Sequence, residues 1–518
     1  LKMLCDREKE INDLVPAEYW NLYADFEDGF RAQLSKISGK KAEIPDGANA
    51  EEIAEDLRKG QFTVGEVKQG HRSPKAYAPF TTSSLQQDAS IKLGFQTRKT
   101  MQIAQQLYEG IEIKGRGARG LVTYIRTDSV RISEVARAAA RDFITEKYGN
   151  QYVGNNFYSN KKKDIQDAHE AIRPSDVTLT PEEARDSLTP DQFKLYTLIW
   201  TRFVASQMAP AQVDTLTIKV NSGIYELKAS GSRQVFDGWR KVYKTSAQGE
   251  EKDLPMLEEG SSLSLKEIIK EQKFTQPPAR YTEAGLVKEM EEQNIGRPST
   301  YAAIISTLTT RKYVKREKKS LVPTKLGFDV TGILQSYFTD IVDVKFTGEL
   351  EDKLDDVEMK KEAWKQVIND FYGGFSKELK VAEEEVEKIQ QEVVLSDQVC
   401  QLCGRPMAIK EGRFGKFLAC TGYPECKNTM PIIKKTGVKC PKCGKDIIEK
   451  KSRKRGRIFY GCMGYPDCDV VYWDKPVGRA CPECGSMLVE TKGKTKTIKC
   501  SNPECKYKEK KEAEKDEA

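Results

Sequence analysis

Twelve of the 13 cysteines in this chain form three similarly spaced groups near its C-terminal end. Each group has a CxxC pair, then 15 to 18 residues, then a second, wider pair. This spacing lets a tight knuckle and a β-hairpin bring four thiolates to one structural, tetrahedral Zn²⁺. The surrounding sequence is rich in Lys and has no secretory signal, which favours metal over disulfides. The predicted ligands of three tandem four-cysteine zinc ribbons are Cys400, Cys403, Cys420, Cys426, Cys440, Cys443, Cys462, Cys468, Cys481, Cys484, Cys500 and Cys505.

Size and charge indicate several domains and a polyanionic ligand. The 518 residues exceed the length at which one hydrophobic core stops growing, roughly 250–300 residues. The formal net charge is +7, but the segment from Asp397 onward holds 27 Lys and Arg against 16 Asp and Glu, so the preceding residues carry −4. No apolar run reaches the ~18–20 residues of a membrane span, and the N-terminal stretch is charged. We predict a cytoplasmic protein.

Strand-like and helix-like patterns alternate along the chain. The stretches FRAQLSKI, VDTLTIKV and IYELKASG alternate apolar and polar residues on both sides of a helical region. This bracketing suggests a β-rich domain with another domain inserted into it. The predicted segments are the start of a helical base (1–20), a β-rich arch in two parts (21–82 and 209–275), a helical domain (83–208), a helical base (276–396), three zinc ribbons (397–432, 437–475 and 478–508) and a disordered tail (509–518).

A tyrosine and an arginine two residues apart form a candidate catalytic pair. In the segment TYIRTDS, Tyr124 and Arg126 face the same side if the backbone is extended. The guanidinium can then hold a phosphate bidentately while the phenol attacks it. Taken alone, such residues are more often an ordinary surface pair, so the catalytic interpretation depends on other motifs.

Two other segments strengthen this interpretation. His169, one of only two histidines, lies in HEAIRPSD beside charged and helix-breaking residues. The segment NIGRPSTY predicts a loop leading into a helix capped by Ser299 or Thr300, which would present backbone N–H groups and Arg297 to a phosphate. Each segment alone is also explained by a turn or a helix cap.

Aromatic residues alternate with Arg and Lys in the first two ribbons. Bases stack on such rings, at ~1–3 kcal/mol per base, while the cations follow the phosphates. Single-stranded DNA is therefore the predicted ligand, although any one ring can equally belong to the small core of its ribbon. The rings are Phe414, Phe417, Tyr423, Phe459, Tyr460 and Tyr465.

Four motifs and the ribbons together carry a family resemblance. YIRTDS, HEAIRPSD, PPARYTEAGLVKEME and IGRPSTYAAII, in this order, resemble the bacterial type IA DNA topoisomerases, in the DNA topoisomerase I branch. The resemblance runs from about Arg7 through the ribbons. It implies a multidomain α+β fold, a torus in which β-rich arches carry the helical tyrosine domain above a helical base. Topoisomerase III-like members and reverse gyrases fit less well, because of the three-quartet tail and the absence of helicase motifs.

The resemblance implies an isomerase that relaxes negatively supercoiled DNA without ATP. Tyr124 is expected to attack one strand and form a 5′-phosphotyrosine before strand passage and religation, while Arg126 stabilises the phosphate charge in the transition state. Eight further residues match the DNA contacts of the family or are expected to support them. They are His169, Arg173, Arg280, Arg297, Ser299, Thr300, Thr127 and Asp128.

The family also begins with a Toprim domain whose acidic residues bind Mg²⁺, and the sequence contains no such unit. We expect that domain to precede Leu1, so that Mg²⁺ is a cofactor bound outside this chain. The alternative is that this chain is a non-catalytic, single-stranded DNA-binding portion of such an enzyme. A tyrosine recombinase would need a different set of Arg and His residues and would form a 3′-phosphotyrosine.

The expected partners follow from the same resemblance. We predict a monomer that binds single-stranded and negatively supercoiled DNA in the nucleoid. Contact between the basic tail and RNA polymerase is a further expectation from the family.

Overall fold

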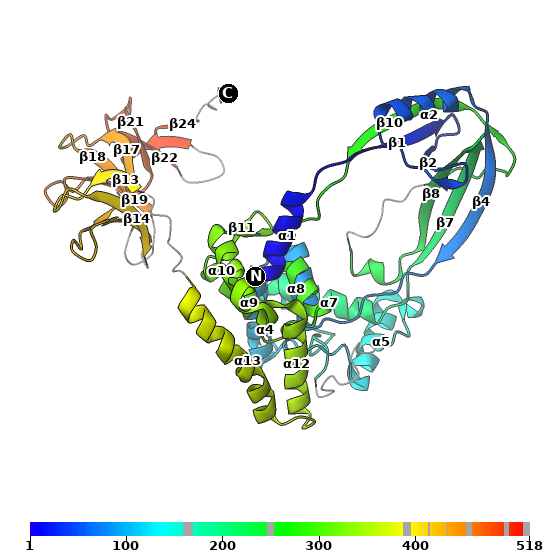
Figure 1. The fold of residues 1–518 in the computed structure, drawn as a ribbon, viewed down its shortest axis with the longest axis horizontal. Coiled ribbons are helices and arrows are strands. Elements are labelled where there is room, and N and C mark those ends of the chain that lie inside the picture. The colour runs from blue at the N-terminus through cyan, green and yellow to red at the C-terminus, as the bar shows by residue number, and fades with distance from the viewer. Residues whose placement is uncertain are drawn as a thin grey trace. The chain divides into compact units, whose positions relative to one another are not determined.

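The computed structural model describes residues 1–158, 169–245, 253–386, 395–412, 415–432, 434–451, 458–491 and 497–510. They form two compact units, Leu1–Glu387 and Lys388–Ala518 (Figure 1). The first unit combines helices with a large sheet, and the second contains three small sheets. The predicted mixed fold with three C-terminal ribbons is confirmed. Among the described helices, none is both long enough and apolar enough to cross a bilayer.

An eight-stranded antiparallel sheet organises the first unit, with the order β10-β1-β2-β8-β7-β4-β9 and with β3 paired to β2. Its strands come from two distant stretches of the chain, so the region between them is inserted into the sheet. The strands are β1 Glu18–Phe26, β2 Arg31–Ile37, β3 Lys40–Lys41, β4 Phe62–Arg72, β7 Gln212–Ser222, β8 Tyr225–Phe236, β9 Ser262–Leu263 and β10 Leu265–Phe274.

The helix at the start of the chain is shorter than predicted. Helix α1 spans Lys2–Asp13, and β1 already begins at Glu18, inside the range 1–20 that we predicted as helical. Pro16 disfavours a helical conformation at Val15, so the chain leaves the helix before it enters the sheet.

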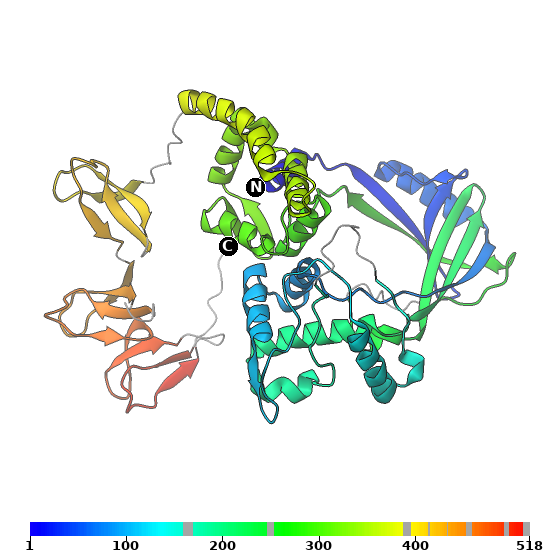
Figure 2. The same ribbon diagram turned by 90° about the horizontal axis from the view of Figure 1, so that it is seen from below.

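Helix α2, Gly47–Lys59, covers one face of the sheet (Figures 1 and 2). Asp46 begins the helix by accepting a hydrogen bond from the backbone N–H of Asn49 at 2.9 Å. Ala50, Ala54 and Leu57 recur at helical spacing and are buried in one core with the inward residues of the strands. The sheet therefore has one face that is apolar and covered.

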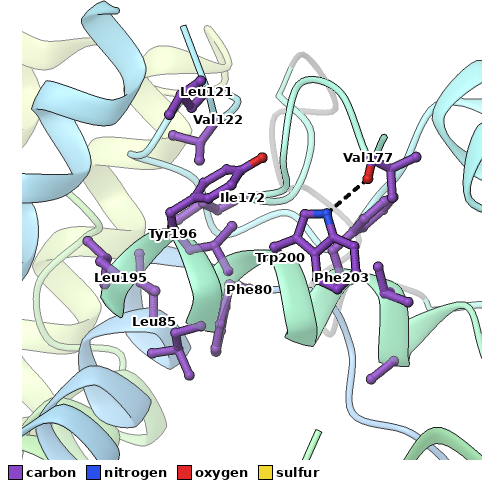
Figure 3. Close-up of a cluster of buried hydrophobic side chains, with 14 of the residues drawn as sticks. Phe80, Leu85, Leu121, Val122, Ile172, Val177, Leu195, Tyr196, Trp200 and Phe203 are labelled. Atoms are coloured by element: carbon purple, nitrogen blue, oxygen red, sulfur yellow. Dashed lines mark hydrogen bonds between the residues drawn. The ribbon is translucent and has the colours of Figure 1, made fainter. Parts of the chain in front are cut away.

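The inserted region is helical and has its own core. Figure 3 shows Tyr196 and Phe203 of its last helix buried against Phe80, while the Trp200 indole donates to the carbonyl of Val177 at 2.9 Å. Full burial of one such ring contributes about 2–3 kcal/mol. The elements are α3 Thr82–Asp88, a π-helical turn Ala89–Leu93, α4 Thr97–Glu109, the hairpin β5 Ile111–Ile113 and β6 Gly117–Arg119, α5 Glu134–Tyr148, α6 Pro181–Ala184 and α7 Pro190–Ser206.

Residues 83–110, the first part of the predicted helical domain, do not form one continuous helix. Gly94 adopts a left-handed conformation with φ 67°, which ends the π-helical turn before α4 begins at Thr97.

The remaining helices of the first unit form a base together with α1. A hydrophobic cluster joins Leu4 of α1 to Leu286 and Val287 of α8 and to Ile305 of α9. The N-terminal helix therefore belongs to this base, although most of the base lies far along the chain. The elements are α8 Glu283–Glu292, α9 Tyr301–Thr310, β11 Val314–Glu317, β12 Ser320–Pro323, α10 Lys325–Tyr337, α11 Thr339–Val342, α12 Val344–Glu358 and α13 Trp364–Glu385.

Each ribbon is a four-stranded antiparallel sheet. The prediction of a disordered tail from residue 509 is wrong at its start, because Glu509 and Lys510 pair with the preceding strand; residues 511–518 lie outside the described residues. The strands are β13 Leu395–Val399, β14 Pro406–Gly412, β15 Gly415–Cys420, β16 Thr429–Pro431, β17 Lys434–Lys439, β18 Asp446–Lys451, β19 Ile458–Cys462, β20 Val471–Tyr472, β21 Lys475–Ala480, β22 Met487–Glu490, β23 Thr497–Cys500 and β24 Lys508–Lys510.

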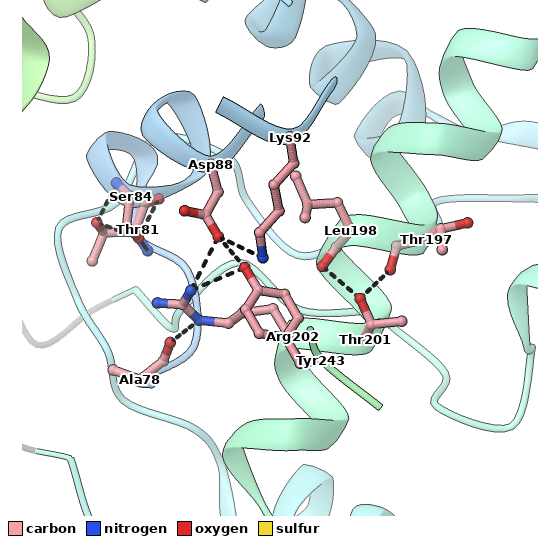
Figure 4. A network of polar contacts seen from close by, with 10 residues as sticks. All are labelled: Ala78, Thr81, Ser84, Asp88, Lys92, Thr197, Leu198, Thr201, Arg202 and Tyr243. Carbon is pink, nitrogen blue, oxygen red and sulfur yellow. Dashed lines mark hydrogen bonds and ion pairs between the residues drawn. The ribbon is translucent and has the colours of Figure 1, made fainter. Parts of the chain in front are cut away.

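A charged network joins the inserted helices to the segment that follows β8 (Figure 4). Arg202 donates to the Asp88 carboxylate at 3.2 Å and to the carbonyl of Ala78 at 2.6 Å. The Tyr243 hydroxyl donates to the same carboxylate, and Lys92 lies 3.4 Å from it. Burial is the main cause of the raised pKa of Tyr243. The side chains of Arg202 and Asp88 are only 10% and 22% exposed. Because the Asp88 carboxylate has lost most of its hydration, it depends on the Arg202 cation to offset the cost of burying its charge.

We predict that Arg202→Ala destabilises the first unit by about 3 kcal/mol, because it leaves a largely buried carboxylate without its main cation. The midpoint of urea denaturation, followed by circular dichroism, measures this. Arg58→Ala removes a solvent-exposed ion pair on α2 and should change the midpoint little. Equal effects of the two substitutions would contradict the assigned role of Arg202.

Candidate active site and zinc centres

Burial alternates along the segment that carries Tyr124. The Tyr124 side chain is 37% exposed and Arg126 is exposed, whereas Ile125 between them is 1% exposed and Thr127 is 2% exposed. The two candidate catalytic side chains are therefore both exposed, although the backbone bends at Ile125 and Arg126 instead of running extended. The buried residues between them anchor the segment in the hydrophobic core.

One side of this segment is fixed by Thr82, the first residue of α3. The Thr82 hydroxyl donates to the carbonyl of Ile125 at 2.7 Å and accepts from the backbone N–H of Thr127 at 2.9 Å. The backbone N–H of Thr82 also donates to the carbonyl of Thr127 at 2.9 Å. A buried hydroxyl with these bonds restrains the backbone on both sides of Arg126.

The other side is fixed by the segment that contains His169. The backbone N–H of Thr123 donates to the carbonyl of Arg173 at 3.0 Å, and its hydroxyl donates to the carbonyl of Ala171 at 2.7 Å. The structure thus brings the HEAIRPSD motif, from His169 onward, beside Tyr124. Asp167 lies outside the described residues.

Two rings flank the Tyr124 phenol. The centroid of His169 lies 5.0 Å away at an interplanar angle of 38°, and that of Tyr108, at the end of α4, lies 5.6 Å away at 69°. The hydroxyl of Tyr124 has no hydrogen-bond partner among the described residues, and neither does the guanidinium of Arg126. Both groups are therefore available to an external ligand.

The three other candidate arginines are already bound to carboxylates. Each makes an ion pair of hydrogen-bonding length, so a DNA phosphate would have to replace or join the carboxylate. The pairs are Arg173 with Glu170 at 2.7 Å, Arg280 with Glu8 at 2.6 Å and Arg297 with Asp355 at 2.7 Å.

The loop before α9 differs in detail from the prediction. Ser299 and Thr300 are exposed, but neither side chain caps the helix. The Thr300 hydroxyl instead accepts from the backbone N–H of Arg297 at 2.9 Å and donates to its carbonyl at 3.2 Å. The turn around Arg297 is therefore closed by Thr300 itself, and Gly296 permits it with φ 77°.

Thr127 and Asp128 differ in their surroundings, because Thr127 is buried and Asp128 is exposed. Thr127 is buried, and its hydroxyl accepts from the backbone N–H of Ser129 at 3.0 Å, so it supports the loop. Asp128 is exposed. Burial chiefly raises the pKa of the Tyr301 phenol on α9, and the charges of Glu291 and Asp128 raise it further, so the tyrosine segment and the start of α9 lie in the same region.

The three cysteine quartets fit zinc. In each quartet the four sulfur atoms lie within 4.8 Å of one another, and the nearest pairs are 3.2–3.8 Å apart. A tetrahedral shell with Zn–S distances of ~2.3 Å separates its sulfurs by roughly 3.8 Å. The Asn428 side chain donates to Cys400 at 3.2 Å, and this bond is the main reason that the pKa of Cys400 is lowered to about 6. Such donors stabilise the thiolate that binds metal.

Comparison with known proteins agrees with this arrangement. A family profile described as DNA topoisomerase matches residues 1–369, and one described as topoisomerase DNA binding C4 zinc finger matches residues 397–435, 437–477 and 478–514. The chain belongs to the bacterial type IA DNA topoisomerases. The structure of full-length topoisomerase I from Thermotoga maritima is similar, with a TM-score of 0.65 and 38% identity over 88% of this chain and 71% of that chain. The family resemblance seen in the sequence is confirmed, and this topoisomerase has three zinc-binding, DNA-binding ribbons.

In the ribbons of this topoisomerase, some aromatic residues are exposed and others are buried. Tyr423 is 66% exposed and Tyr465 is 70% exposed, and the amines of Lys410 and Lys450 lie 5.9 and 5.4 Å from their respective ring centroids. Tyr460 is 8% exposed and belongs to a ribbon core. Phe417 and Phe459 are half-buried, and Phe414 lies outside the described residues.

Sequence reasoning missed several residues of this topoisomerase that define the site. Tyr108 and Thr82 lie before the tyrosine motif and carry no pattern of their own. Glu283 lies within a motif that we quoted, yet its role depends on distant partners. Its buried carboxylate accepts from the backbone N–H of Thr97 on α4 at 2.7 Å and from Arg316 at 2.8 Å, which joins the tyrosine-bearing helices to the base.

We predict that Cys443→Ser reduces the zinc content from three ions to two per chain and unfolds only the second ribbon, because a small module folds through its metal. Zinc analysis and the amide NMR spectrum measure the two effects. Cys5→Ser is the matched control, since Cys5 lies outside the quartets. Three ions retained in Cys443→Ser, or one lost in Cys5→Ser, would show that the ligand assignment is wrong.

Proposed function

We propose that this topoisomerase relaxes negatively supercoiled DNA without ATP by transient cleavage of one strand. The Tyr124 oxygen attacks a phosphodiester and becomes bonded to the 5′ phosphate, while the 3′ oxygen leaves as a free hydroxyl. The other strand passes through the gap, and attack by the 3′ hydroxyl then releases Tyr124. Since the phosphotyrosine conserves the energy of the broken bond, no nucleotide is consumed. The proposal rests on an exposed phenol and an exposed guanidinium that project from one restrained segment, and neither group has a hydrogen-bond partner among the residues that the structure describes.

Arg126 is proposed to bind the reacting phosphate. Its guanidinium lies two residues from the phenol on the exposed side of the segment. A fixed cation that faces the developing negative charge stabilises the transition state more than the substrate, because that charge grows during attack. No reorganisation of the loop is required, since Thr82 and Thr123 already hold it.

The other basic residues are proposed to position the strand. His169 lies against the Tyr124 ring, so a strand that approaches the phenol also meets the imidazole. Arg173, Arg280 and Arg297 are proposed to share or exchange their carboxylate partners for phosphates when DNA binds. Ser299, Thr300 and Asp128 are exposed around this region and complete the proposed contact surface.

Mg²⁺ is proposed as a cofactor of cleavage and resealing, where it would neutralise phosphate charge. Within the described residues, the groups of three or more potential metal ligands are the cysteine quartets alone, which suit zinc and not Mg²⁺. We therefore assign no carboxylate of this chain to Mg²⁺, and each proposed step is one that the residues of this chain perform.

The ribbons are proposed to bind single-stranded DNA. Tyr423 and Tyr465 offer solvent-exposed rings on which bases can stack, and the neighbouring Lys410 and Lys450 can follow the phosphates. Action as a monomer in the nucleoid of the cytoplasm, and contact of the tail with RNA polymerase, remain predictions.

The proposal is tested by covalent capture. We expect the chain, mixed with single-stranded oligonucleotides labelled at either end and Mg²⁺ and then denatured in detergent, to retain only the 3′-labelled fragment, since Tyr124 bonds to the 5′ phosphate of that fragment. Tyr124→Phe should abolish the adduct without changing oligonucleotide affinity. If the chain binds oligonucleotides tightly but forms no adduct, the alternative holds, and this chain is a DNA-binding portion only.

For the ribbons, we predict that Tyr423→Ala combined with Tyr465→Ala weakens binding of a thymidine oligonucleotide at least about tenfold, because two stacked bases are lost. Fluorescence anisotropy at fixed salt measures the dissociation constant. Tyr372→Ala, which removes an exposed ring from α13, is the control and should have no effect. Unchanged affinity in the double variant would exclude stacking on these rings.

A further inference from the structure

Tyr108 lies against the proposed nucleophile, but neither the family motifs nor the proposed chemistry uses it. It is the next-to-last residue of α4, and its ring packs edge-on against the Tyr124 ring at 5.6 Å and 69°. His169 approaches the same ring at 5.0 Å. The ring of Tyr124 thus contacts two aromatic neighbours that come from different segments of the chain.

The position of Tyr108 relative to Tyr124 is fixed by the backbone. The N–H of Leu121 donates to the carbonyl of Leu107 at 2.7 Å, and both side chains are buried. At Gly120, a Cβ would lie 2.6 Å from the carbonyl oxygen of Tyr108, so the two backbones approach as closely as only glycine allows. The β5–β6 hairpin closes this loop, and the end of α4 is therefore attached directly to the segment that leads into Tyr124.

Tyr108 contributes little to the core. Its side chain is 39% exposed, and its hydroxyl has no hydrogen-bond partner in the part of the chain that the structure describes. Tyr196, in contrast, is fully buried and donates to the carbonyl of Leu179 at 2.7 Å. The Tyr108 ring is neither buried nor hydrogen-bonded, but it packs in the preferred edge-on geometry. Its main interaction is therefore with the Tyr124 ring.

We infer that Tyr108 is a positioning residue for the Tyr124 phenol. The inference rests on the proposed function, since it assigns Tyr108 the task of holding the nucleophile before attack. The edge-on contact with Tyr108, together with the contact with His169, limits the rotamers of Tyr124, so that its hydroxyl stays directed toward a phosphate at Arg126. Loss of the contact lets the phenol sample unproductive orientations, which lowers the rate of attack and leaves DNA affinity unchanged.

The orientation itself is measured with 3-fluorotyrosine incorporated at position 124 of the full 518-residue chain. The ¹⁹F resonance should be displaced from that of free 3-fluorotyrosine by the ring currents of its neighbours. Tyr108→Ala should reduce the displacement and narrow the line, whereas Tyr108→Phe, which keeps the ring, should preserve both. Tyr372→Ala removes a distant exposed ring and should change nothing. An unchanged resonance in Tyr108→Ala would overturn the inference, and this result does not depend on whether the chain cleaves DNA.

Covalent capture then connects orientation to chemistry. We expect Tyr108→Ala to slow adduct formation about three- to tenfold at saturating oligonucleotide, with an unchanged dissociation constant and rescue by Tyr108→Phe. A weakened dissociation constant with an unchanged rate would instead make Tyr108 a base-stacking residue, and a lowered unfolding midpoint with an unchanged ¹⁹F resonance would make it structural. Absence of an adduct in the unsubstituted chain would contradict the proposed function but not the ¹⁹F result.

Discussion

The segment that carries Tyr124 is held by hydrogen bonds from two neighbouring parts of the chain, and every other candidate group is placed by its relation to that segment. Thr82 fixes the backbone after the tyrosine, and Thr123 ties the backbone before it to the segment of His169. A phenol has no intrinsic reactivity at neutral pH, so its use as a nucleophile depends on where the protein holds it. The buried residues on either side of Tyr124 supply that restraint and leave the phenol and Arg126 free.

In the proposed strand passage the tyrosine-bearing helices separate from the base, and hydrogen bonds between polar groups join the two regions. Ser83 donates to Glu291 at 2.8 Å, and Thr97 donates to Glu283 from both its backbone N–H and its hydroxyl. Polar groups that separate exchange their partners for water, so opening such a contact costs less than exposing an apolar core of the same area. The two regions are otherwise joined through the strands of the large sheet. A restrained tyrosine segment in a region that meets the base through such bonds is consistent with the proposed reaction.

Local pattern predicted the features that depend on local geometry. The cysteine spacing predicted the ligands of all three zinc centres, and the motif that contains Tyr124 and Arg126 has both side chains exposed. Local sequence patterns did not predict interactions between residues that lie far apart in the chain. Arg280 pairs with Glu8, 272 positions away, and nothing in either segment indicates the other. Thr300 bonds back to the Arg297 turn, so the expected helix cap does not form. These hydrogen bonds and ion pairs depend on how the chain packs, because packing determines which buried polar groups lie close enough to pair in the absence of a ligand.

Identification of the residue that becomes bonded to DNA tests the central claim most directly. After trapping on an oligonucleotide, trypsin should release Tyr124 within residues 120–126 and Tyr108 within residues 100–114, so mass spectrometry separates the two. We expect nucleotide mass on the peptide that contains Tyr124 and an unmodified peptide for Tyr108. Nucleotide mass on any other peptide, with residues 120–126 unmodified, would contradict it.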